Sequence, residues 1–367
     1  MKHVLVTGGA GFIGSNFIHY LLEHSDCEII NFDALTYAGN LENLKDIAQN
    51  ERYKFVRGDI RNAEQVSEAL CRFEVDTVVN FAAETHVDRS IVSPDAFVST
   101  NVLGTQTLLE CARTYWGLAP TDKHCRDYKP GVRFLQVSTD EVYGSLGETG
   151  KFHENSPIEP NSPYAASKAS ADLFVRAYHE TFAFPAVVTR CSNNFGPYQF
   201  PEKLIPLIIY NSLHNRRIPV YGDGRQVRNW LYVEDHCSAL CNVLESGKDG
   251  EAYNIGGDAE ETNLQVIRMI LRMVGRPESL IQFVADRPGH DRRYAMDYTK
   301  LNQHTGWKPA NSFAEGLERT VRWYLENEKW LEAVAGRDFQ TYYRAMYTEG
   351  ETEYDTIQPS ARAGEIL

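Results

Sequence analysis

A glycine-rich segment near the amino terminus constrains the fold of this chain more than any other feature. Thr7-Gly8-Gly9-Ala10-Gly11-Phe12-Ile13-Gly14 directly follows the β-branched run His3–Thr7 and opens the amphipathic stretch Phe12–Glu23. A loop between a strand and a helix presents free backbone N–H groups and the positive end of the helix dipole at one point. Those groups hold a pyrophosphate without Lys or Arg, so the segment predicts a dinucleotide site.

The glycines and a later carboxylate define this dinucleotide site further. Gly8 permits the tight turn, Gly11 lets the backbone approach a pyrophosphate, and Gly14 allows close contact between helix and strand. Asp33 ends the second β-branched run, about 20 residues after Gly14, where an acid binds the adenosine ribose hydroxyls. Because this carboxylate would repel a 2′-phosphate, NAD is expected as the cofactor rather than NADP.

Short β-branched runs alternate with stretches of helical period across the first half of the chain. The expected strands are His3–Thr7, Glu28–Asp33, Tyr53–Arg57, Thr77–Phe81, Arg133–Ser138 and Ala186–Arg190. The expected helices are Phe12–Glu23, Ala63–Arg72, Thr100–Tyr115 and Tyr164–Thr181. This alternation predicts an α/β fold of the Rossmann-like type, with a doubly wound parallel sheet and right-handed crossovers.

The alternation loosens after Phe195, and the second half reads as a smaller, mixed α/β lobe that binds substrate. Helices are expected at Glu202–His214, Glu234–Ser246, Asn263–Val274 and Phe313–Asn327, the last opening with a capping box at Ser312 and Glu315. We therefore expect an NAD-binding domain over residues 1–195 and a substrate lobe over 196–335, from which some segments return to the main sheet. Residues 336–367 form a polar C-terminal extension whose composition predicts partial disorder.

Charge and composition exclude several function classes. The chain has 367 residues, 50 Asp and Glu against 37 Lys and Arg, and a net charge of -13. Such an acidic body repels a nucleic-acid backbone, so an anionic ligand must be met by a few placed cations or helix ends. The longest nearly apolar stretch, Leu204–Tyr210, is too short to span a bilayer. Seven scattered cysteines without a C-x-x-C pair predict no metal site and a reducing, cytoplasmic setting.

Tyr164 and Lys168 stand four residues apart and therefore on one face of a helix. A phenol has a pKa near ~10 and is a poor base at neutral pH. A neighbouring ammonium, together with the charge of an oxidised nicotinamide, favours the phenolate and makes it a base for an alcohol proton. With Thr139 at the end of a preceding strand, the pair fits an alcohol-oxidation site of the short-chain dehydrogenase type.

Two adjacent carboxylates, Asp140 and Glu141, follow Thr139 although oxidation alone needs neither. Neighbours on a straight strand point to opposite faces, so both reach one ligand only if the chain turns at Asp140. An acidic loop cap is the alternative interpretation. Two carboxyls held at different pKa values in one pocket would instead supply a base and an acid. Removal of water next to a newly formed ketone requires that combination.

These motifs together resemble those of the dTDP-glucose 4,6-dehydratase family, in the nucleotide-sugar branch of the extended short-chain dehydrogenases. Further segments that carry the resemblance are Phe81–Ser90, Arg190–Tyr198 and Asp286–Arg293. The resemblance implies that Tyr164 takes the C4 hydroxyl proton while hydride passes to NAD+. Glu141 then removes the C5 proton and Asp140 protonates the departing C6 hydroxyl. Hydride returns to C6, which leaves a 4-keto-6-deoxy sugar nucleotide.

The same resemblance implies contact residues for both ligands. The implied cofactor contacts are Gly8, Gly11, Phe12, Ile13, Gly14, Asp33, Ala34, Leu35, Thr36, Asp59, Ile60, Ala82, Ala83, Thr85, Thr100, Tyr164, Lys168 and Asn194. The implied substrate contacts are Thr139, Asn193, Lys203, Leu204, Pro219, Val220, Tyr221, Arg228, Asn263, Asp286, Arg287, Pro288, Gly289 and His290. Arg228 and Arg287 suit a diphosphate, because a guanidinium binds phosphate oxygens in pairs.

Other activities on this scaffold stay open as alternatives. A nucleotide-sugar epimerase needs no carboxylate pair, and in a UDP-glucuronate decarboxylase Ser would stand at the position of Asp140. A dehydratase for a UDP- or GDP-linked hexose differs only in pocket shape. A non-catalytic NAD-sensing regulator would need the glycines but not Tyr164, Lys168, Asp140 or Glu141.

The resemblance also implies a homodimer through a four-helix bundle. The helices near Thr100–Tyr115 and Tyr164–Thr181 would pair with their copies in a second subunit. Four residues would then face the partner or, alternatively, pack on the sheet: Leu108, Leu109, Cys111 and Ala112. We assign no proton-transfer role to His86 or His290, and we expect Trp230 in the core.

Overall fold

A computed structural model of the protein describes residues 1–286 and 290–336. The described chain divides into two interleaved compact units. The first unit comprises residues 1–199, 226–262 and 290–320, and the second comprises 200–225, 263–286 and 321–336. The first boundary lies after residue 199 rather than 195, and residues 226–262 and 290–320 belong to the first unit again. The expected C-terminal extension lies, apart from Gly336, outside the described residues.

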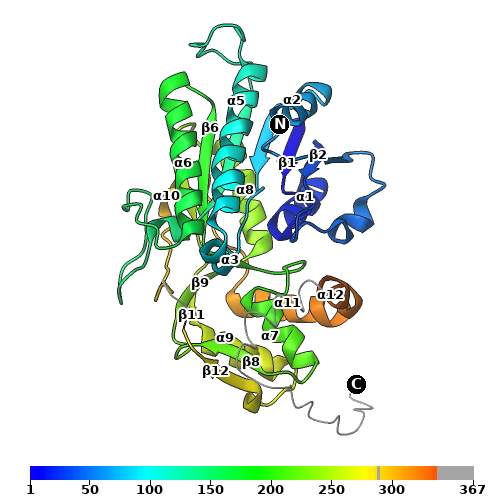
Figure 1. Ribbon diagram of the computed structural model, residues 1–367, viewed down its shortest axis with the longest axis vertical. Helices are drawn as coiled ribbons and strands as arrows, with labels where there is room; N and C mark the ends of the chain where they lie inside the picture. The colour runs from blue at the N-terminus through cyan, green and yellow to red at the C-terminus, as the bar shows by residue number, and fades with distance from the viewer. Residues whose placement is uncertain (287–289, 337–367) are drawn as a thin grey trace. The chain divides into compact units, whose positions relative to one another are not determined.

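The first unit is built on a seven-stranded parallel sheet (Figure 1). The strands run in the order β10 (Ala252–Ile255), β6 (Ala186–Cys191), β5 (Arg133–Thr139), β4 (Thr77–Asn80), β1 (His3–Thr7), β2 (Glu28–Asp33) and β3 (Tyr53–Arg57). Every neighbouring pair in this sheet is parallel. The order reverses between β1 and β4, which is where such sheets bind ligands beyond the strand ends. The expected doubly wound sheet is confirmed.

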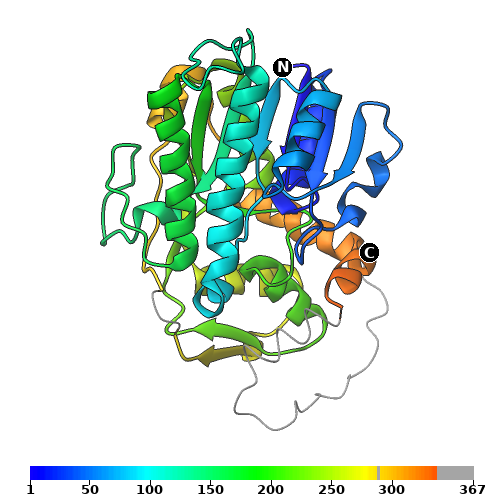
Figure 2. The ribbon, with the colours of Figure 1, turned by 45° about the horizontal axis from the view of Figure 1, so that its top comes forward.

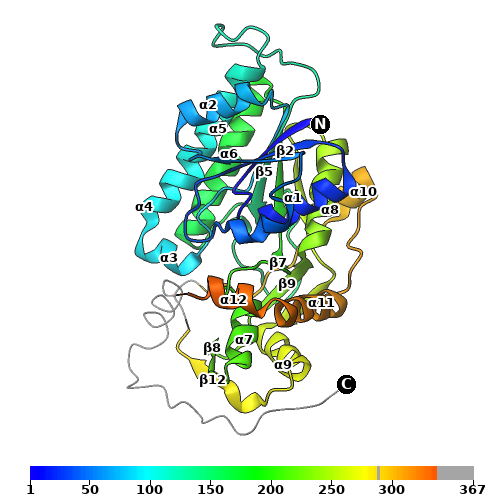
Figure 3. The same cartoon turned by 90° about the vertical axis from the view of Figure 1, so that its right-hand side faces the viewer.

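Helices cover both faces of this sheet (Figure 3). One face carries α2 (Ala63–Arg72), α5 (Thr105–Trp116) and α6 (Pro163–Phe182), and the other carries α1 (Phe12–His24), α8 (Val233–Ser246) and α10 (Thr299–Thr305). Val4 and Val6 of β1 pack into the core beneath α1 and α8, whereas Leu5 packs into the core beneath α2 and α5. Both faces of the strand are therefore buried, which explains its unbroken apolar character.

The largest departure from the expected elements lies before α5. Instead of one helix from Thr100, a π-helical turn η2 (Val98–Gly104) precedes α5, which stands beside α6 in front of the sheet (Figure 2). A wide turn of this kind adds a residue to the helical ladder and recurs at functional sites. It carries Asn101, whose buried side chain makes contacts described below.

The first unit also contains a small mixed sheet and several short helices. This sheet has the order β11 (Ala259–Thr262), β9 (Val227–Tyr232) and β7 (Asn193–Phe195), and the short helices are η1 (Leu41–Ile47), α3 (Val87–Val92), α4 (Pro94–Phe97) and η3 (Asp140–Tyr143). Trp230 packs edge-on against Phe195 and lies in the core, as expected. Helix α11 (Phe313–Glu326), which crosses the boundary at residue 320, begins with the expected capping box of Ser312 and Glu315.

The second unit contains one parallel strand pair and its helices. Its elements are α7 (Leu204–Leu213), β8 (Ile218–Tyr221), α9 (Asn263–Met273), η4 (Glu278–Leu280), β12 (Ile281–Val284) and α12 (Glu328–Val334). Strand β12 pairs with β8, and α7 packs on α9. Within the described part of the chain, no helix has the length and apolar character that crossing a bilayer would require.

Candidate active site

The glycine-rich loop forms a cradle at the amino end of α1. Gly8 has a φ of +67°, and a Cβ there would lie 2.7 Å from the backbone nitrogen of Ala82. A Cβ on Gly14 would lie 2.4 Å from the carbonyl oxygen of Gly8, so Gly14 allows contact with the loop rather than with the strand. Among the described residues, no side chain caps α1 at Gly11, which leaves its first N–H groups to a ligand.

Asp33 closes this cradle from the end of β2. Its Oδ2 accepts a hydrogen bond from the Ala10 nitrogen at 2.9 Å, and its Oδ1 accepts one from the Leu35 nitrogen at 2.7 Å. Burial raises the pKa of this carboxyl, while the two backbone donors oppose the shift. The carboxylate is therefore held rigidly beside the glycine loop, where each oxygen can accept a further hydrogen bond.

Several other expected cofactor residues occupy loops at the same carboxyl edge of the sheet, whereas Thr100 lies in η2 and Asn194 in β7. Ala34, Leu35 and Thr36 follow β2, while Ala82, Ala83 and Thr85 follow β4. Asp59 and Ile60 lie beyond β3, which ends at Arg57, rather than in the strand. Arg61 binds the Asp59 carboxylate and lowers its pKa, so this side chain is already paired within the protein.

The chain turns directly after Thr139, as simultaneous access to both carboxylates requires. Strand β5 ends at Thr139, and Asp140–Tyr143 form the 3₁₀ turn η3. The Thr139 hydroxyl accepts a hydrogen bond from the Glu141 nitrogen at 3.3 Å and donates one to Oδ1 of Asp140 at 3.2 Å. Gly144 ends the turn with a φ of +82°. The expected turn at Asp140 is confirmed.

Asp140 is electrostatically distinct from an ordinary carboxylate. Its side chain is 2% exposed, and its Oδ2 has no hydrogen-bond partner among the described residues. Burial, followed by the negative charge of Glu141, raises the pKa of Asp140 to about 8. The group is therefore mostly a neutral acid at pH 7, with a proton to give.

Helix α6 brings Tyr164 and Lys168 to the same place. Ser162 caps the helix by accepting a hydrogen bond from the Ala165 nitrogen at 3.1 Å. Lys168 donates from Nζ to the Val137 carbonyl oxygen at 2.7 Å, beside the strand that ends at Thr139. Burial raises the pKa of Tyr164 well above its usual value, and the charge of Glu141 adds to the shift, whereas a hydrogen bond with Thr139 lowers it. Formation of the phenolate therefore needs further positive charge in the site.

Two buried side chains, which were not expected from the sequence, support these residues. The Asn101 amide donates to the Glu84 carbonyl oxygen at 3.0 Å and to the Ser167 hydroxyl at 2.8 Å, beneath the helix that carries Tyr164. His236 lies 2.9 Å through Nδ1 from Oδ1 of Asn194, and burial lowers the pKa of this histidine to about 3. It is therefore neutral and orients the Asn194 amide. In the sequence, only the polar Asn101 among the apolar positions of a helical period indicates such a supporting residue, and nothing near His236 does.

The expected substrate residues are distributed over both units. Thr139, Asn193, Arg228 and His290 belong to the first unit, and Lys203, Leu204, Pro219, Val220, Tyr221, Asn263 and Asp286 belong to the second. Arg228 is 6% exposed, lies over the Tyr294 ring, and contributes a positive charge that lowers the pKa of Asp140. Arg287, Pro288 and Gly289 lie outside the described residues.

Neither His86 nor His290 has an assigned role in proton transfer. His86 is buried and accepts a hydrogen bond from the Arg89 nitrogen at the start of α3, which is a structural role. His290 lies in the first unit. Over residues 1–286 and 290–336, no group of three or more His, Cys, Asp or Glu side chains is placed to hold a metal ion.

Comparisons with known proteins find 4,6-dehydratases of nucleotide sugars. A family described as GDP-mannose 4,6 dehydratase matches residues 5–320. The dTDP-glucose 4,6-dehydratase of Xanthomonas campestris pv. campestris (strain B100) is 52% identical over 90% of this chain and 95% of its own length. The solved dTDP-glucose 4,6-dehydratase of Streptomyces venezuelae, with NAD and TYD bound, is 49% identical with a TM-score of 0.84, covering 91% of this chain and all of that one.

A solved relative with a different activity shares the fold at lower identity. The UDP-glucose 4-epimerase of Thermus thermophilus, in complex with NAD, is 31% identical with a TM-score of 0.79, over 89% of this chain and 100% of that one. The higher identity to the dehydratases accompanies the carboxylate pair on η3, which an epimerase does not need. The chain is thus a member of the short-chain dehydrogenase group that acts on nucleotide sugars and, within it, belongs to the dTDP-glucose 4,6-dehydratase family.

Proposed function

We propose that the protein is an NAD-dependent lyase that converts dTDP-glucose into dTDP-4-keto-6-deoxyglucose. The observation that carries this proposal is the buried turn at Asp140, where a carboxyl with a pKa of about 8 stands beside Glu141 and Tyr164. The names of relatives that cover nine-tenths of the chain support it. All seven cysteines are free thiols, which favours a reducing, cytoplasmic setting.

The glycine cradle fits the dinucleotide that this function requires. A Cβ at Gly8 or Gly14 would meet backbone atoms closer than 3 Å, so the loop is built for close backbone approach. The uncapped N–H groups of α1 would hold the diphosphate, and Asp33 would accept from the ribose hydroxyls. When bound, NAD supplies the hydride acceptor for oxidation at C4 and the hydride donor for reduction at C6.

Tyr164 is the base for the first step. Its phenolate oxygen takes the proton of the C4 hydroxyl and becomes the neutral phenol, and Thr139, whose hydroxyl lowers the pKa of Tyr164, orients the ring. Lys168 is anchored at the Val137 carbonyl oxygen one helical turn away, so its position relative to Tyr164 is set by α6. A charged ammonium there favours the phenolate, which offsets part of the effect of burial.

Glu141 and Asp140 divide the elimination between them. A ketone at C4 makes the C5 proton acidic, and the ionised Glu141 carboxylate removes it. Asp140 gives its proton to the C6 oxygen, so the C–O bond breaks and water leaves. The unpartnered Oδ2 of Asp140 is the atom placed to hold that proton, because Oδ1 already accepts from Thr139. After reduction at C6, a proton returns to C5.

The proposal includes the substrate contacts that the family resemblance implies. Arg228 would meet the diphosphate together with Arg287, since both are guanidinium groups on an acidic protein. Asn193 would bind the substrate from β7, beside the Asn194 residue that we assign to the cofactor. The same assignment extends to the second-unit residues from Lys203 to Asp286 named above.

The test of this function is a comparison of nucleotide sugars. Purified protein is offered dTDP-, UDP- and GDP-glucose, and the formation of a keto-deoxy product is followed. We expect the highest kcat/KM with dTDP-glucose, and deuterium placed at C4 should appear in the new methyl group. A higher kcat/KM with the UDP- or GDP-sugar would change the assigned substrate but leave the assigned reaction unchanged. Absence of a methyl product with all three would refute the proposal.

The raised pKa of Asp140 predicts a pH dependence for water loss. The acid form of Asp140 is needed, and this form predominates below its pKa of about 8. We expect the elimination rate constant to fall above that pH, approaching about tenfold per pH unit, because only the protonated fraction reacts. Single-turnover measurements of water loss at a series of pH values will show this decrease in the rate constant. A break only near ~4, the range of an ordinary carboxyl, would contradict the assignment.

We also propose a homodimer, with a corrected set of facing residues. Leu108, Leu109, Cys111 and Ala112 are buried within the subunit beneath the sheet, so they do not face a partner. Leu173 and Phe174 on α6 are 52% and 39% exposed, and Leu103 before α5 is 56% exposed. Exposed apolar side chains on adjacent helices are typical of an interface. Leu173→Glu should shift the mass in solution from dimer to monomer, and an unchanged mass would exclude this surface.

A further inference from the structure

We propose that Arg190, Asp172 and Tyr143 form a positioning network for the elimination step. The network joins the turn that carries Asp140 and Glu141 to the helix that carries Tyr164 and Lys168. None of its members is assigned to substrate or cofactor. The inference rests on the proposed function, and it concerns how the acid–base pair is held relative to the oxidation site.

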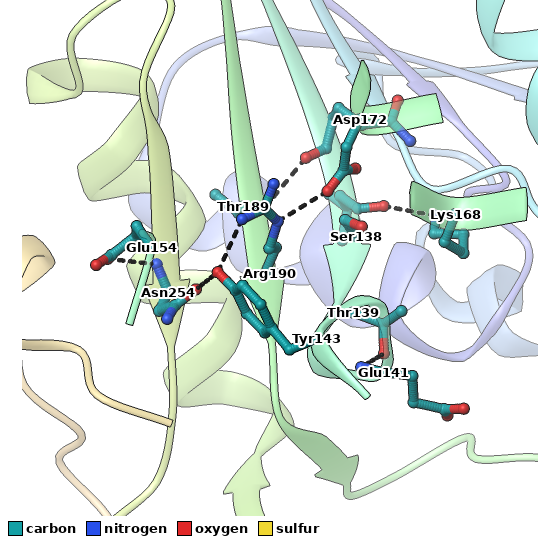
Figure 4. Close-up of polar contacts among 12 residues, drawn as sticks. Ser138, Thr139, Glu141, Tyr143, Glu154, Lys168, Asp172, Thr189, Arg190 and Asn254 are labelled. Carbon is teal, nitrogen blue, oxygen red and sulfur yellow. Dashed lines mark hydrogen bonds and ion pairs between the residues drawn. The ribbon is translucent and has the colours of Figure 1, made fainter. Parts of the chain in front are cut away.

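Arg190 is the centre of this network (Figure 4). Its Nε donates to Oδ2 of Asp172 at 2.8 Å, and its Nη1 donates to the hydroxyl oxygen of Tyr143, also at 2.8 Å. Arg190 lies on β6 directly beside Ser138 of β5, the residue before Thr139. From β6, the guanidinium thus links α6 to the turn η3, and its planar fork of N–H donors fixes the direction of both hydrogen bonds.

Each end of the bridge belongs to a catalytic element. Asp172 follows Lys168 by one turn of α6 and Tyr164 by two, so all three lie along one face of a continuous helix. Tyr143 is the last residue of η3, the four-residue turn that contains Asp140 and Glu141. A displacement of Tyr143 would therefore rotate the short turn and move both carboxylates relative to Tyr164.

A third strand completes the support of Tyr143. Its hydroxyl donates to Oδ1 of Asn254 at 2.8 Å, and Asn254 pairs with Arg190 across β10 and β6. The Asn254 amide donates in turn to the Phe152 carbonyl oxygen at 3.1 Å, and the Phe152 ring stacks on that of Tyr143. The stacking of the Tyr143 ring and the two hydrogen bonds of its hydroxyl therefore hold the turn η3 in one conformation.

The burial of this ion pair favours positioning over simple stabilisation. Arg190 and Asp172 are 6% and 2% exposed, so both charges are removed from water. A buried ion pair is often replaceable by apolar residues without loss of stability, which makes geometric specificity the better reason for its presence. Asp172 also faces Lys168, whose pKa burial lowers and the Asp172 charge raises. The same carboxylate thus acts on the oxidation site and anchors the elimination turn.

The test separates the two chemical steps in one turnover. Tyr143→Phe keeps the ring and removes only the hydroxyl. With NAD and dTDP-glucose, NADH absorbance reports oxidation at C4, and mass spectrometry of quenched samples reports water loss. We expect oxidation within about twofold of wild type and water loss slower by about 10- to 100-fold, because a small misplacement of a reacting group costs that much. Arg190→Lys keeps the positive charge but loses the planar pair of guanidinium donors. It should also slow water loss more than oxidation, but by a smaller factor.

Tyr253→Phe is the matched control. Tyr253 neighbours Asn254 on β10, but its buried hydroxyl forms hydrogen bonds with His304 and the Lys248 nitrogen and, among the described residues, with no member of the network. We expect both rates to stay at the wild-type value. The inference is overturned if Tyr143→Phe and Arg190→Lys slow both steps equally, if neither slows water loss, or if Tyr253→Phe gives the same split. Failure of the wild-type protein to turn over any nucleotide hexose would instead refute the proposed function.

Discussion

Asp140→Asn will leave oxidation at C4 within a few-fold of wild type and slow water loss by about 10²- to 10⁴-fold. Asparagine has nearly the same shape and fits the same buried position, but it has no acidic proton to give to the C6 oxygen. General acid catalysis contributes about that factor to the rate. Because elimination is blocked after oxidation, NADH and the 4-keto sugar should accumulate. Rapid mixing with absorbance detection, followed by analysis of quenched samples, measures both.

Glu141→Gln is the matched partner of this variant. It should also keep oxidation, but it should prevent exchange of the C5 proton with deuterium from the solvent. Asp140→Asn should permit that exchange, because the Glu141 carboxylate is still present to take the C5 proton. Loss of C4 oxidation in both variants, with the fold intact by circular dichroism, would contradict the division of roles. Equal loss of C5 exchange in both would contradict it as well.

Tyr164→Phe will lower the rate of C4 oxidation by about 10²- to 10⁴-fold while leaving the fold and NAD binding intact. We assign the phenol as the base for the C4 hydroxyl, and the burial that raises its pKa also keeps water from replacing it. Single-turnover formation of NADH measures the rate, and quenching of protein fluorescence by NAD measures binding. No later step should be detectable, since elimination needs the ketone.

Tyr178→Phe on the same helix controls for the loss of a buried phenol. The Tyr178 hydroxyl donates to Oε2 of Glu110 at 3.0 Å and accepts from the Gln106 amide, away from the turn at Asp140. It should leave both oxidation and water loss at wild-type rates. A Tyr164→Phe protein that oxidises C4 at more than about a tenth of the wild-type rate would show that another group is the base.

Several local features were predictable because neighbours in the chain create them. Asn62 caps α2 by accepting from the Glu64 and Gln65 nitrogens, and α2 has the bounds that its periodicity predicts. The Gln65 side chain, three residues after the cap, accepts a hydrogen bond from the Asp59 nitrogen at 2.9 Å. The turn after Thr139 followed from the chemistry expected of two adjacent carboxylates, and the structure places it there.

Other features depend on residues far apart in the chain, and no local pattern contains them. Arg190 reads as an ordinary strand residue until the sheet places it between Asp172 and Tyr143. Asn101 and His236 acquire their roles only from Glu84 and Asn194, which fold against them. The sequence also left open whether Leu108, Leu109, Cys111 and Ala112 face a partner or pack on the sheet, because a helix period does not distinguish the two faces. The structure packs them on the sheet.

Hydrophobic period, glycine placement and helix caps thus determined most helices and strands and the chemical types of the reacting groups, because each acts within one turn or one strand. The alternation of strands and helices indicated a parallel sheet but not its strand order. Tertiary contacts decided the charge state of Asp140, the partners of the buried ions and the interleaving of the two units. Burial and long-range hydrogen bonds set these quantities, and both exist only when distant segments have met.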